Sequence, residues 1–142
     1  MSGESWLVAL TMTLTLGTAS AVANDVAPYP VRDCGQFTTQ MDLNECAGAN
    51  LHAADAALNK VYQQVMAQQG DASSKEQLKD VERAWIGYRD KECAFEVGAQ
   101  RDGGSIWPME MSNCLEEKTA ARIRELTRLR RCTAGVSACN PH

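Results

Sequence analysis

The stretch AWIGYRDKEC, residues 84–93, places an aromatic ring, a cation and a cysteine at regular intervals, as Trp85, Arg89 and Cys93. On an α-helix Arg89 lies about 40° around the axis from Trp85, and Cys93 lies about 80° from Trp85. All three side chains can therefore face the interior together. The stretch predicts a helix that packs on its neighbours through an arginine as well as through apolar groups.

The helix that contains this stretch is expected to begin at Ser74, because Gln77 three residues later completes a capping box. It should end near Val97, before the glycines of the next segment. One side of it carries Leu78, Val81, Trp85, Tyr88 and Arg89.

Two further segments have helical periodicity. Residues 38–69 contain few helix breakers and offer Thr39 as an N-cap. A third helix is expected from Asn113, where Glu116 follows as an N-terminal signal. The apolar and polar residues that recur at intervals of three and four are Asn44, Gly48, Leu51, Asp55, Leu58, Asn59, Tyr62 and Met66 in the first segment and Leu115, Thr119, Arg122, Leu126 and Leu129 in the last.

These patterns predict an all-α fold, a small three-helix antiparallel domain stapled by disulfides. No strand-like alternation occurs in the 142-residue chain. The predicted organisation is a signal peptide at residues 1–23, an extended segment at 24–38, a helical domain over 34–131 and a tail at 132–142.

The first residues resemble an export signal. The run WLVALTMTLTLGTASAVA is apolar and then small, and Ala21-Val22-Ala23 fits an A-x-A cleavage site, so we expect cleavage after Ala23. The run is too short and too weakly apolar for a membrane anchor. The mature protein is therefore expected to be periplasmic or secreted.

All six cysteines follow this cleavage site. An even number in a small exported domain indicates disulfides. A zinc site is a poor alternative, because no pair has C-x-x-C spacing and the histidines are His52 and the C-terminal His142. We expect no metal and no cofactor, and the residues alone leave the pairing open.

Charge is unevenly distributed along the chain, whose net charge is −4. Residues 33–117 hold 15 acidic against 7 basic side chains, and residues 118–142 hold 1 against 6. An acidic body suits a cationic partner, and a basic end suits an anionic surface, although solvated helix faces are the simpler explanation of each pattern taken alone.

Five polar residues lie on the predicted inner faces: Asp55, Asn59, Arg89, Thr119 and Arg122. A buried guanidinium needs a carboxylate, and Asp55 is the candidate for Arg89 or Arg122. Such a network fixes the register of the helices in the simpler interpretation. In the functional interpretation it lines a polar cleft that is open at one end.

Residues 98–113 are expected to form a loop, punctuated by Gly103, Gly104 and Pro108. The loop carries Ile106 and Trp107. If exposed, it is a recognition loop with an aromatic anchor. If folded under, it is a lid on the core.

Catalytic signatures are missing from the sequence, which has no G-x-S-x-G and no H-E-x-x-H motif. We therefore expect no catalytic residues and no enzyme. The run RIRELTRLRR lacks interleaved aromatics, so nucleic acid is not an expected partner.

The order of motifs resembles the LprI-type lysozyme-inhibitor family over about residues 34–129. The resemblance rests on Cys34, MDLNECA, AADAALNKVY, AWIGYRDKEC, the Gly103-Gly104-Ser105 turn and CLEEKTAARIREL. It implies a small, all-helical, secreted or periplasmic protein that inhibits lysozyme. It also implies the pairs Cys34 with Cys46 and Cys93 with Cys114, which leaves Cys132 with Cys139.

The leading hypothesis is accordingly a non-enzymatic protein that binds and inhibits a lysozyme-type muramidase. The candidate binding residues are Gly104, Ser105, Ile106, Trp107, Asp55, Asn59, Arg89, Asp90 and Arg122. The alternative is an envelope interaction module whose basic third helix docks on an anionic surface or a partner protein, with Arg124, Arg128 and Arg130 as contacts.

Overall fold

The computed structural model describes residues 28–133, and the predicted signal peptide and most of the predicted tail lie outside them. Three long helices make up most of this part: α1 (Gln40–Ala67), α2 (Ala72–Val97) and α4 (Trp107–Thr133). Short turns lie between them and before them: η1 (Cys34–Gln36), α3 (Gln100–Gly103) and η2 (Gly104–Ile106). The prediction of an all-α, disulfide-stapled three-helix domain is confirmed.

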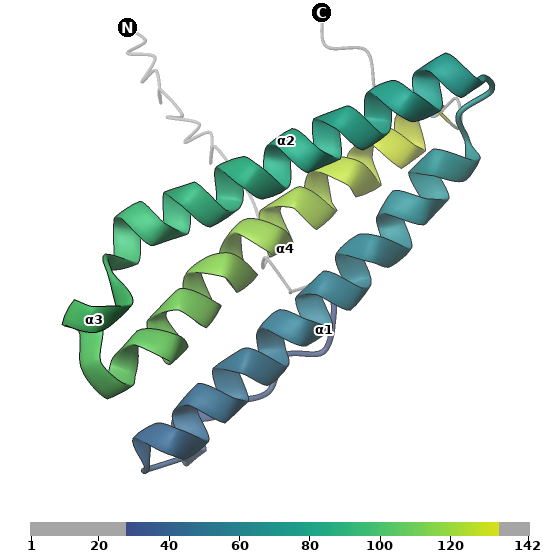
Figure 1. The fold of residues 1–142 in the computed structure, drawn as a ribbon. Coiled ribbons are helices and arrows are strands. Elements are labelled where there is room, and N and C mark those ends of the chain that lie inside the picture. The colour runs from purple at the N-terminus through teal and green to yellow at the C-terminus, as the bar shows by residue number, and fades with distance from the viewer. Residues whose placement is uncertain (1–27, 134–142) are drawn as a thin grey trace, which may run out of the picture.

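The helices run up, down and up (Figure 1). Asn44 near the start of α1 donates to the carbonyl of Ser105 just before α4, at 3.0 Å, and Arg130 near the end of α4 donates to Gln64 near the end of α1. The first and last helices are therefore parallel, and α2 is antiparallel to both.

The ends of the helices follow from local chemistry. Thr39 caps α1, because its hydroxyl accepts the backbone N–H of Asp42 at 3.2 Å, as predicted. The predicted cap of α2 is wrong. Asp71 lies three residues before Ser74 and accepts the N–H of Ser74 at 2.8 Å, so α2 begins at Ala72. The helix ends at Val97 as expected, and Gly98 follows with φ 81°, a conformation that favours glycine.

The expected start of the last helix is also wrong. We predicted a loop up to Asn113, but α4 begins at Trp107. Pro108 lies in the first helical turn, where no backbone N–H is needed, so it opens the helix instead of interrupting it. The connection between α2 and α4 is correspondingly short.

The apolar core is built mainly by α1 and α4. Its buried members are Tyr29, Ala54, Leu58, Val61, Val65, Leu78, Ala120, Ile123 and Leu126, of which Leu78 alone comes from α2. Trp85 packs against this core and is partly buried. The remaining contacts of α2 with the other helices are largely polar.

Two residues expected to face inward from α2 are exposed. Val81 is 53% exposed and Tyr88 is 56% exposed. Relative to Leu78 they lie about 60° and 80° to one side, whereas Glu82, Trp85 and Arg89 lie within about 40°. The buried stripe of α2 is narrower than the apolar pattern indicated.

Candidate functional site

Arg89 connects α2 to both other long helices. Its Nη1 donates to Asp55 Oδ1 of α1 at 3.1 Å and to Thr119 Oγ1 of α4 at 3.0 Å. Its Nε also donates to Asp90 Oδ1 at 3.0 Å. The Arg89 side chain is 13% exposed, and Thr119 is fully buried. Of the two predicted partners of Asp55, Arg89 is thus the one observed. Its bonds to Asp55 and Thr119 together fix the relative position of the three helices.

Arg122 has a different carboxylate partner. Its Nε and Nη2 both donate to Glu82 Oε2, at 3.1 and 2.9 Å, and its Nη1 donates to Glu125 at 2.9 Å. Burial alone lowers the pKa of Arg122, but the hydrogen bonds that it donates to Glu82 and Glu125 outweigh that effect and raise the pKa above its usual value. The guanidinium therefore stays charged beneath α2.

Trp85 lies beside both guanidinium groups. The Cζ atoms of Arg89 and Arg122 are 5.3 and 5.7 Å from the centroid of its ring. These distances are within the range of cation–π attraction. Residues 84–93 therefore join α2 to the other helices through Arg89 and through the Trp85 ring, which also contacts Arg122 of α4.

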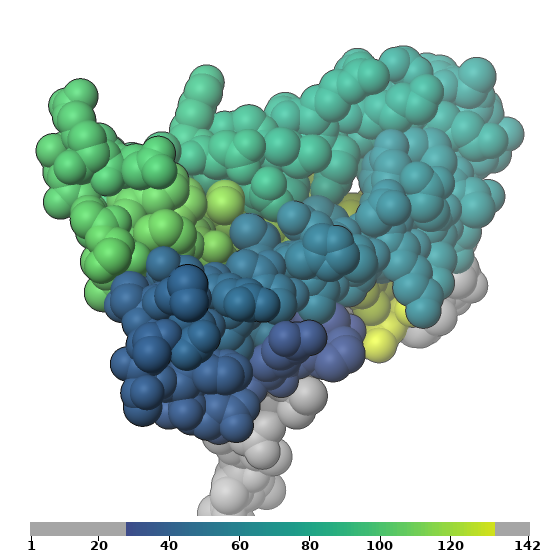
Figure 2. All heavy atoms as spheres, turned by 60° about the horizontal axis from the view of Figure 1, so that its bottom comes forward, coloured from purple at the N-terminus to yellow at the C-terminus, as the bar shows by residue number. Residues whose placement is uncertain are grey.

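A groove of about 400 Å³ lies between α1 and α2 next to this network. Figure 2 shows it as a hollow between the two helices, with α4 behind it. Its lining is mixed in polarity: Asp55, Leu58, Asn59, Tyr62, Lys79, Glu82, Arg83, Ile86 and Arg89. Its volume is within the range of small-molecule sites, roughly 300–1,000 Å³.

The bundle end near α3 holds both described disulfides, and we call it the disulfide end. Cys34 is bonded to Cys46, and Cys93 to Cys114, as the resemblance implied. The first bond ties the N-terminal segment to α1, and the second ties α2 to α4. The expected partner of Cys132 is Cys139, which lies outside the described residues.

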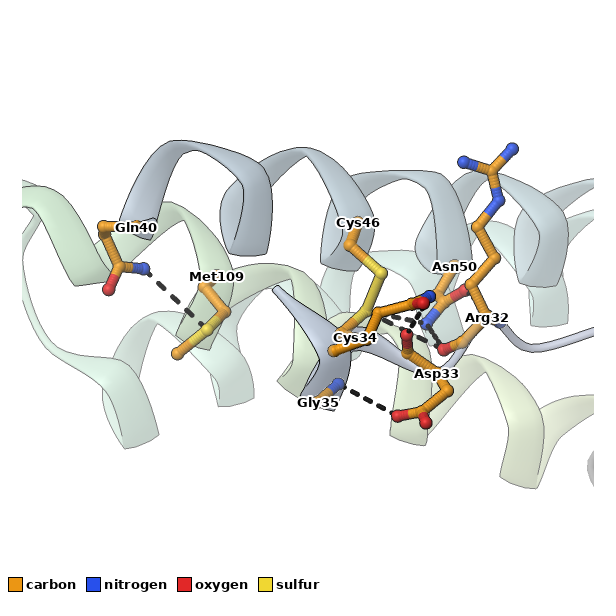
Figure 3. Close-up of a disulfide and its surroundings, with 9 residues drawn as sticks. Arg32, Asp33, Cys34, Gly35, Gln40, Cys46, Asn50 and Met109 are labelled. Carbon is orange, nitrogen blue, oxygen red and sulfur yellow. Dashed lines mark hydrogen bonds between the residues drawn. A yellow bond between two sulfur atoms is a disulfide. The ribbon is translucent and has the colours of Figure 1, made fainter. Parts of the chain in front are cut away.

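The N-terminal segment is held to α1 beside the first disulfide (Figure 3). The backbone N–H of Arg32 donates to Asn50 Oδ1 at 2.8 Å, and Asn50 Nδ2 donates back to the Arg32 carbonyl at 3.1 Å. Further back, the hydroxyl of Tyr29 donates to Glu116 of α4. Burial and this hydrogen bond raise the pKa of Tyr29 well above its usual value. The segment is therefore part of the folded domain.

Trp107 is a support at the disulfide end. Its Nε1 donates to the carbonyl of Gly98 at 3.0 Å, and its side chain is partly buried. A Cβ at Gly103 would lie 2.7 Å from the Trp107 side chain, so the ring packs closely on that glycine. Trp107 holds the turn between α2 and α4 in place.

Other large apolar side chains are exposed at the disulfide end. Phe95 is 86% exposed, Met41 is 75% exposed and Ile106 is 40% exposed. The surrounding sequence is acidic, because residues 90–117 hold seven Asp and Glu against two Lys and Arg. The disulfide end therefore combines a backbone fixed by two disulfides with exposed apolar side chains and negative charge.

The predicted site residues fall in two regions. Asp55, Arg89 and Asp90 meet around the network, Arg122 adjoins it through Trp85, and Asn59 lines the groove. The other candidates, Gly104, Ser105, Ile106 and Trp107, lie at the disulfide end and do not line the groove.

Sequence reasoning overlooked two prominent residues, Glu82 and Phe95. Glu82 lies three residues before Trp85 and seven before Arg89, so helical spacing alone places it on the buried stripe. Phe95 lies two residues after Cys93, about 200° around the helix, which directs it away from the core.

None of the helices within residues 28–133 is both long and apolar enough to serve as a membrane span.

Comparison with known proteins identifies one matching family and two relatives. Residues 33–126 match the family described as lysozyme inhibitor LprI. An uncharacterized protein of Rhizobium meliloti (strain 1021) is 44% identical, over 78% of this chain and 86% of the relative. The uncharacterized protein YecT of Escherichia coli (strain K12) is 26% identical, over 81% of this chain and 87% of YecT. No solved structure matches.

Proposed function

The chain belongs to the lysozyme inhibitor LprI family, and on this premise we propose that it binds a lysozyme-type muramidase and blocks it without catalysing a reaction itself. The observation that carries the proposal is the disulfide end, where exposed apolar side chains stand on a covalently fixed frame. The proposed place of action is the periplasm or the exterior of the cell, in keeping with the predicted signal peptide.

Phe95 is the proposed anchor of the contact. Aromatic side chains dominate the binding energy of many protein interfaces. Phe95 is 86% exposed, and it lies two residues from the Cys93–Cys114 bond. Its backbone is therefore fixed before binding, which reduces the entropy lost on association. Ile106 and Met41 extend the apolar contact at the same end.

Charge supports the same surface. C-type lysozymes are typically cationic, and residues 90–117 carry a net charge of −5. Opposite charges steer the encounter and increase the association rate. Inhibition should therefore weaken as salt concentration rises.

In mechanism, the turn formed by α3 and η2 would cover the substrate groove of the muramidase. Asn44 fixes this turn from α1 through the Ser105 carbonyl, and Trp107 fixes it from α4 through the Gly98 carbonyl. In this mechanism Trp107 supports the turn, and Ile106 and Phe95 contact the muramidase. The proposed inhibitor acts by occlusion.

The test is inhibition of cell-wall lysis by a c-type lysozyme, measured with the oxidised mature protein. We expect Phe95→Ser to weaken inhibition at least tenfold, as loss of a hot-spot residue does. Val81→Ser is the matched control, because Val81 is also exposed on α2 but lies at the other end of the helix. Equal inhibition by both variants would remove the disulfide end from the mechanism.

A second candidate function rests on the last turns of α4. Of the predicted contacts, Arg124 and Arg128 are exposed, whereas Arg130 is partly buried and donates to Gln64. Arg131 is exposed and shares the face of Arg124 and Arg128. This face suits an anionic surface or partner in the cell envelope. Charge reversal of Arg124 and Arg128 should release the protein from anionic vesicles if this face docks there. If the charge-reversed variant binds the vesicles as the wild type does, this second function is excluded and only the inhibitor function remains.

A further inference from the structure

The groove between α1 and α2 is not used by the proposed function, and its chemistry points to a ligand of its own. Two of its polar groups, the Asn59 amide and the Tyr62 hydroxyl, make no hydrogen bond to the described residues. Glu82 Oε1 also lacks a partner, but it is buried and so is not accessible to a ligand. The groove thus presents donors and acceptors that a polar ligand can satisfy.

Each cation that lines the groove has a carboxylate partner. Lys79 pairs with Glu76 at 2.9 Å, and Arg83 pairs with Asp80 at 3.3 Å. Arg89 is held by Asp55 and Asp90. A phosphate or carboxylate ligand would have to compete with these acids for every cation. The arrangement therefore favours a neutral ligand.

Apolar surface accompanies the polar groups. Leu58 and Ile86 line the groove from α1 and α2, and Tyr62 offers an aromatic ring. A sugar ring has one apolar face and many hydroxyls, and an acetamido group adds a methyl and an amide. The Asn59 amide can pair with that amide, while Leu58 and Ile86 can receive the methyl.

We propose that the groove between α1 and α2 binds a short neutral saccharide that carries N-acetylated sugars. The ligand hydroxyls exchange hydrogen bonds with Tyr62 and Asn59, and the free oxygen of Asp55 accepts a further one. The site is distinct from the disulfide end, so it does not depend on inhibition of lysozyme.

The probe is chitotetraose, and cellotetraose is the matched control because it has the same linkage without the acetamido groups. Two-dimensional amide NMR of the oxidised protein should show chitotetraose shifting resonances of Asn59, Tyr62 and Ile86 at millimolar concentration. Shifts at the disulfide end alone, or none, would overturn the site. Equal binding of cellotetraose would overturn the assignment to N-acetylated sugars.

Variants separate binding from folding. Tyr62→Phe removes one hydroxyl and should weaken binding roughly fivefold. Asn59→Trp fills the groove from an exposed position and should abolish binding. Gln77→Ala, an exposed amide on α2 that does not line the groove, should bind as the wild type does. Normal binding by Asn59→Trp in a folded protein would contradict the proposal.

Sedimentation with insoluble peptidoglycan distinguishes free oligosaccharides from segments of peptidoglycan chains as the ligand. If the site takes free oligosaccharides only, insoluble peptidoglycan should fail to sediment the protein while chitotetraose still binds. If it takes chain segments, peptidoglycan should sediment the wild type and Gln77→Ala but not Asn59→Trp. Either pattern supports the groove, whereas sedimentation of Asn59→Trp together with the wild type would contradict it.

Discussion

Glu82 of α2 forms a largely buried ion pair with Arg122 of α4. It is 8% exposed, and its Oε2 receives two hydrogen bonds from the largely buried Arg122. Removal of one member of a buried ion pair is strongly destabilising, because the other charge loses its buried partner. Without Glu82, Arg122 would keep only the more exposed Glu125 as a partner, so the α2–α4 contact should depend strongly on Glu82.

Glu82→Ala is expected to lower the free energy of unfolding by about 3 kcal/mol. Asp80→Ala provides the control on the same helix, because its pair with Arg83 is exposed and should be worth less than about 1 kcal/mol. Urea unfolding followed by circular dichroism measures both. Similar losses in the two variants would show that Glu82 has no special role.

Arg89 illustrates what the sequence can predict at the scale of a residue. Its helical position relative to Trp85 placed it inside, and Asp55, a carboxylate on the predicted inner face of the first helix, was a candidate partner for Arg89 or Arg122. Glu82 was overlooked because a glutamate on a helix is usually solvated. Burial of a charge depends on its tertiary partner, here Arg122, and that partner is 40 residues away.

At the scale of the element, the ends of the helices decide how well the sequence predicts the fold. Thr39 and Val97 mark ends that local chemistry determines, and both were predicted correctly. The start of α4 at Trp107 was missed, because a proline close to a glycine pair usually indicates a loop. Only contacts with the neighbouring helices show that Pro108 belongs to the first turn of α4. Ser74 was predicted as the cap of α2 because Gln77 completes a capping box, but Asp71 takes that role. Both residue types are good caps, and local preferences alone do not separate them.

The cap of α2 gives a prediction that depends on pH. Asp71 accepts hydrogen bonds from the backbone and side chain of Ser74, and these lower its pKa below the usual 3.8. Because the folded pKa is depressed, its stabilising effect is present above about pH 4 and is lost as pH falls through the folded value.

Asp71→Ala should therefore lower Tm at pH 7 and have little effect at the lowest pH at which the protein stays folded. Thermal unfolding of both proteins across this range measures the difference. Asp42→Ala on α1 is a control that leaves the α2 cap intact. A Tm difference between wild type and Asp71→Ala that stays constant with pH would contradict the assignment of Asp71 as the cap.

At the scale of the whole molecule, the two disulfides within residues 28–133 compensate for a modest apolar core. The Cys93–Cys114 bond closes a loop with a sequence separation of 21, and the Cys34–Cys46 bond closes one of 12. In the chain-entropy model each is worth about 3 kcal/mol. Both lie at the proposed contact surface, so they link stability to function.

The double variant Cys93→Ala/Cys114→Ala should lose about 3 kcal/mol of unfolding free energy. It should also lose inhibition more than it loses helical content, because the bond fixes Phe95 and the α3 turn. Denaturant unfolding and the lysis assay on the same sample measure the two effects. Full inhibition by this variant would show that the frame is not required for binding.

The measurement that tests the central claim most directly is amide hydrogen exchange of the oxidised mature protein, alone and with an equimolar c-type lysozyme. If the disulfide end is the inhibitory surface, lysozyme should protect residues 93–110 and the first turn of α1, and leave the last turns of α4 unchanged. Protection confined to the end of α4, or none at any site, would contradict the account.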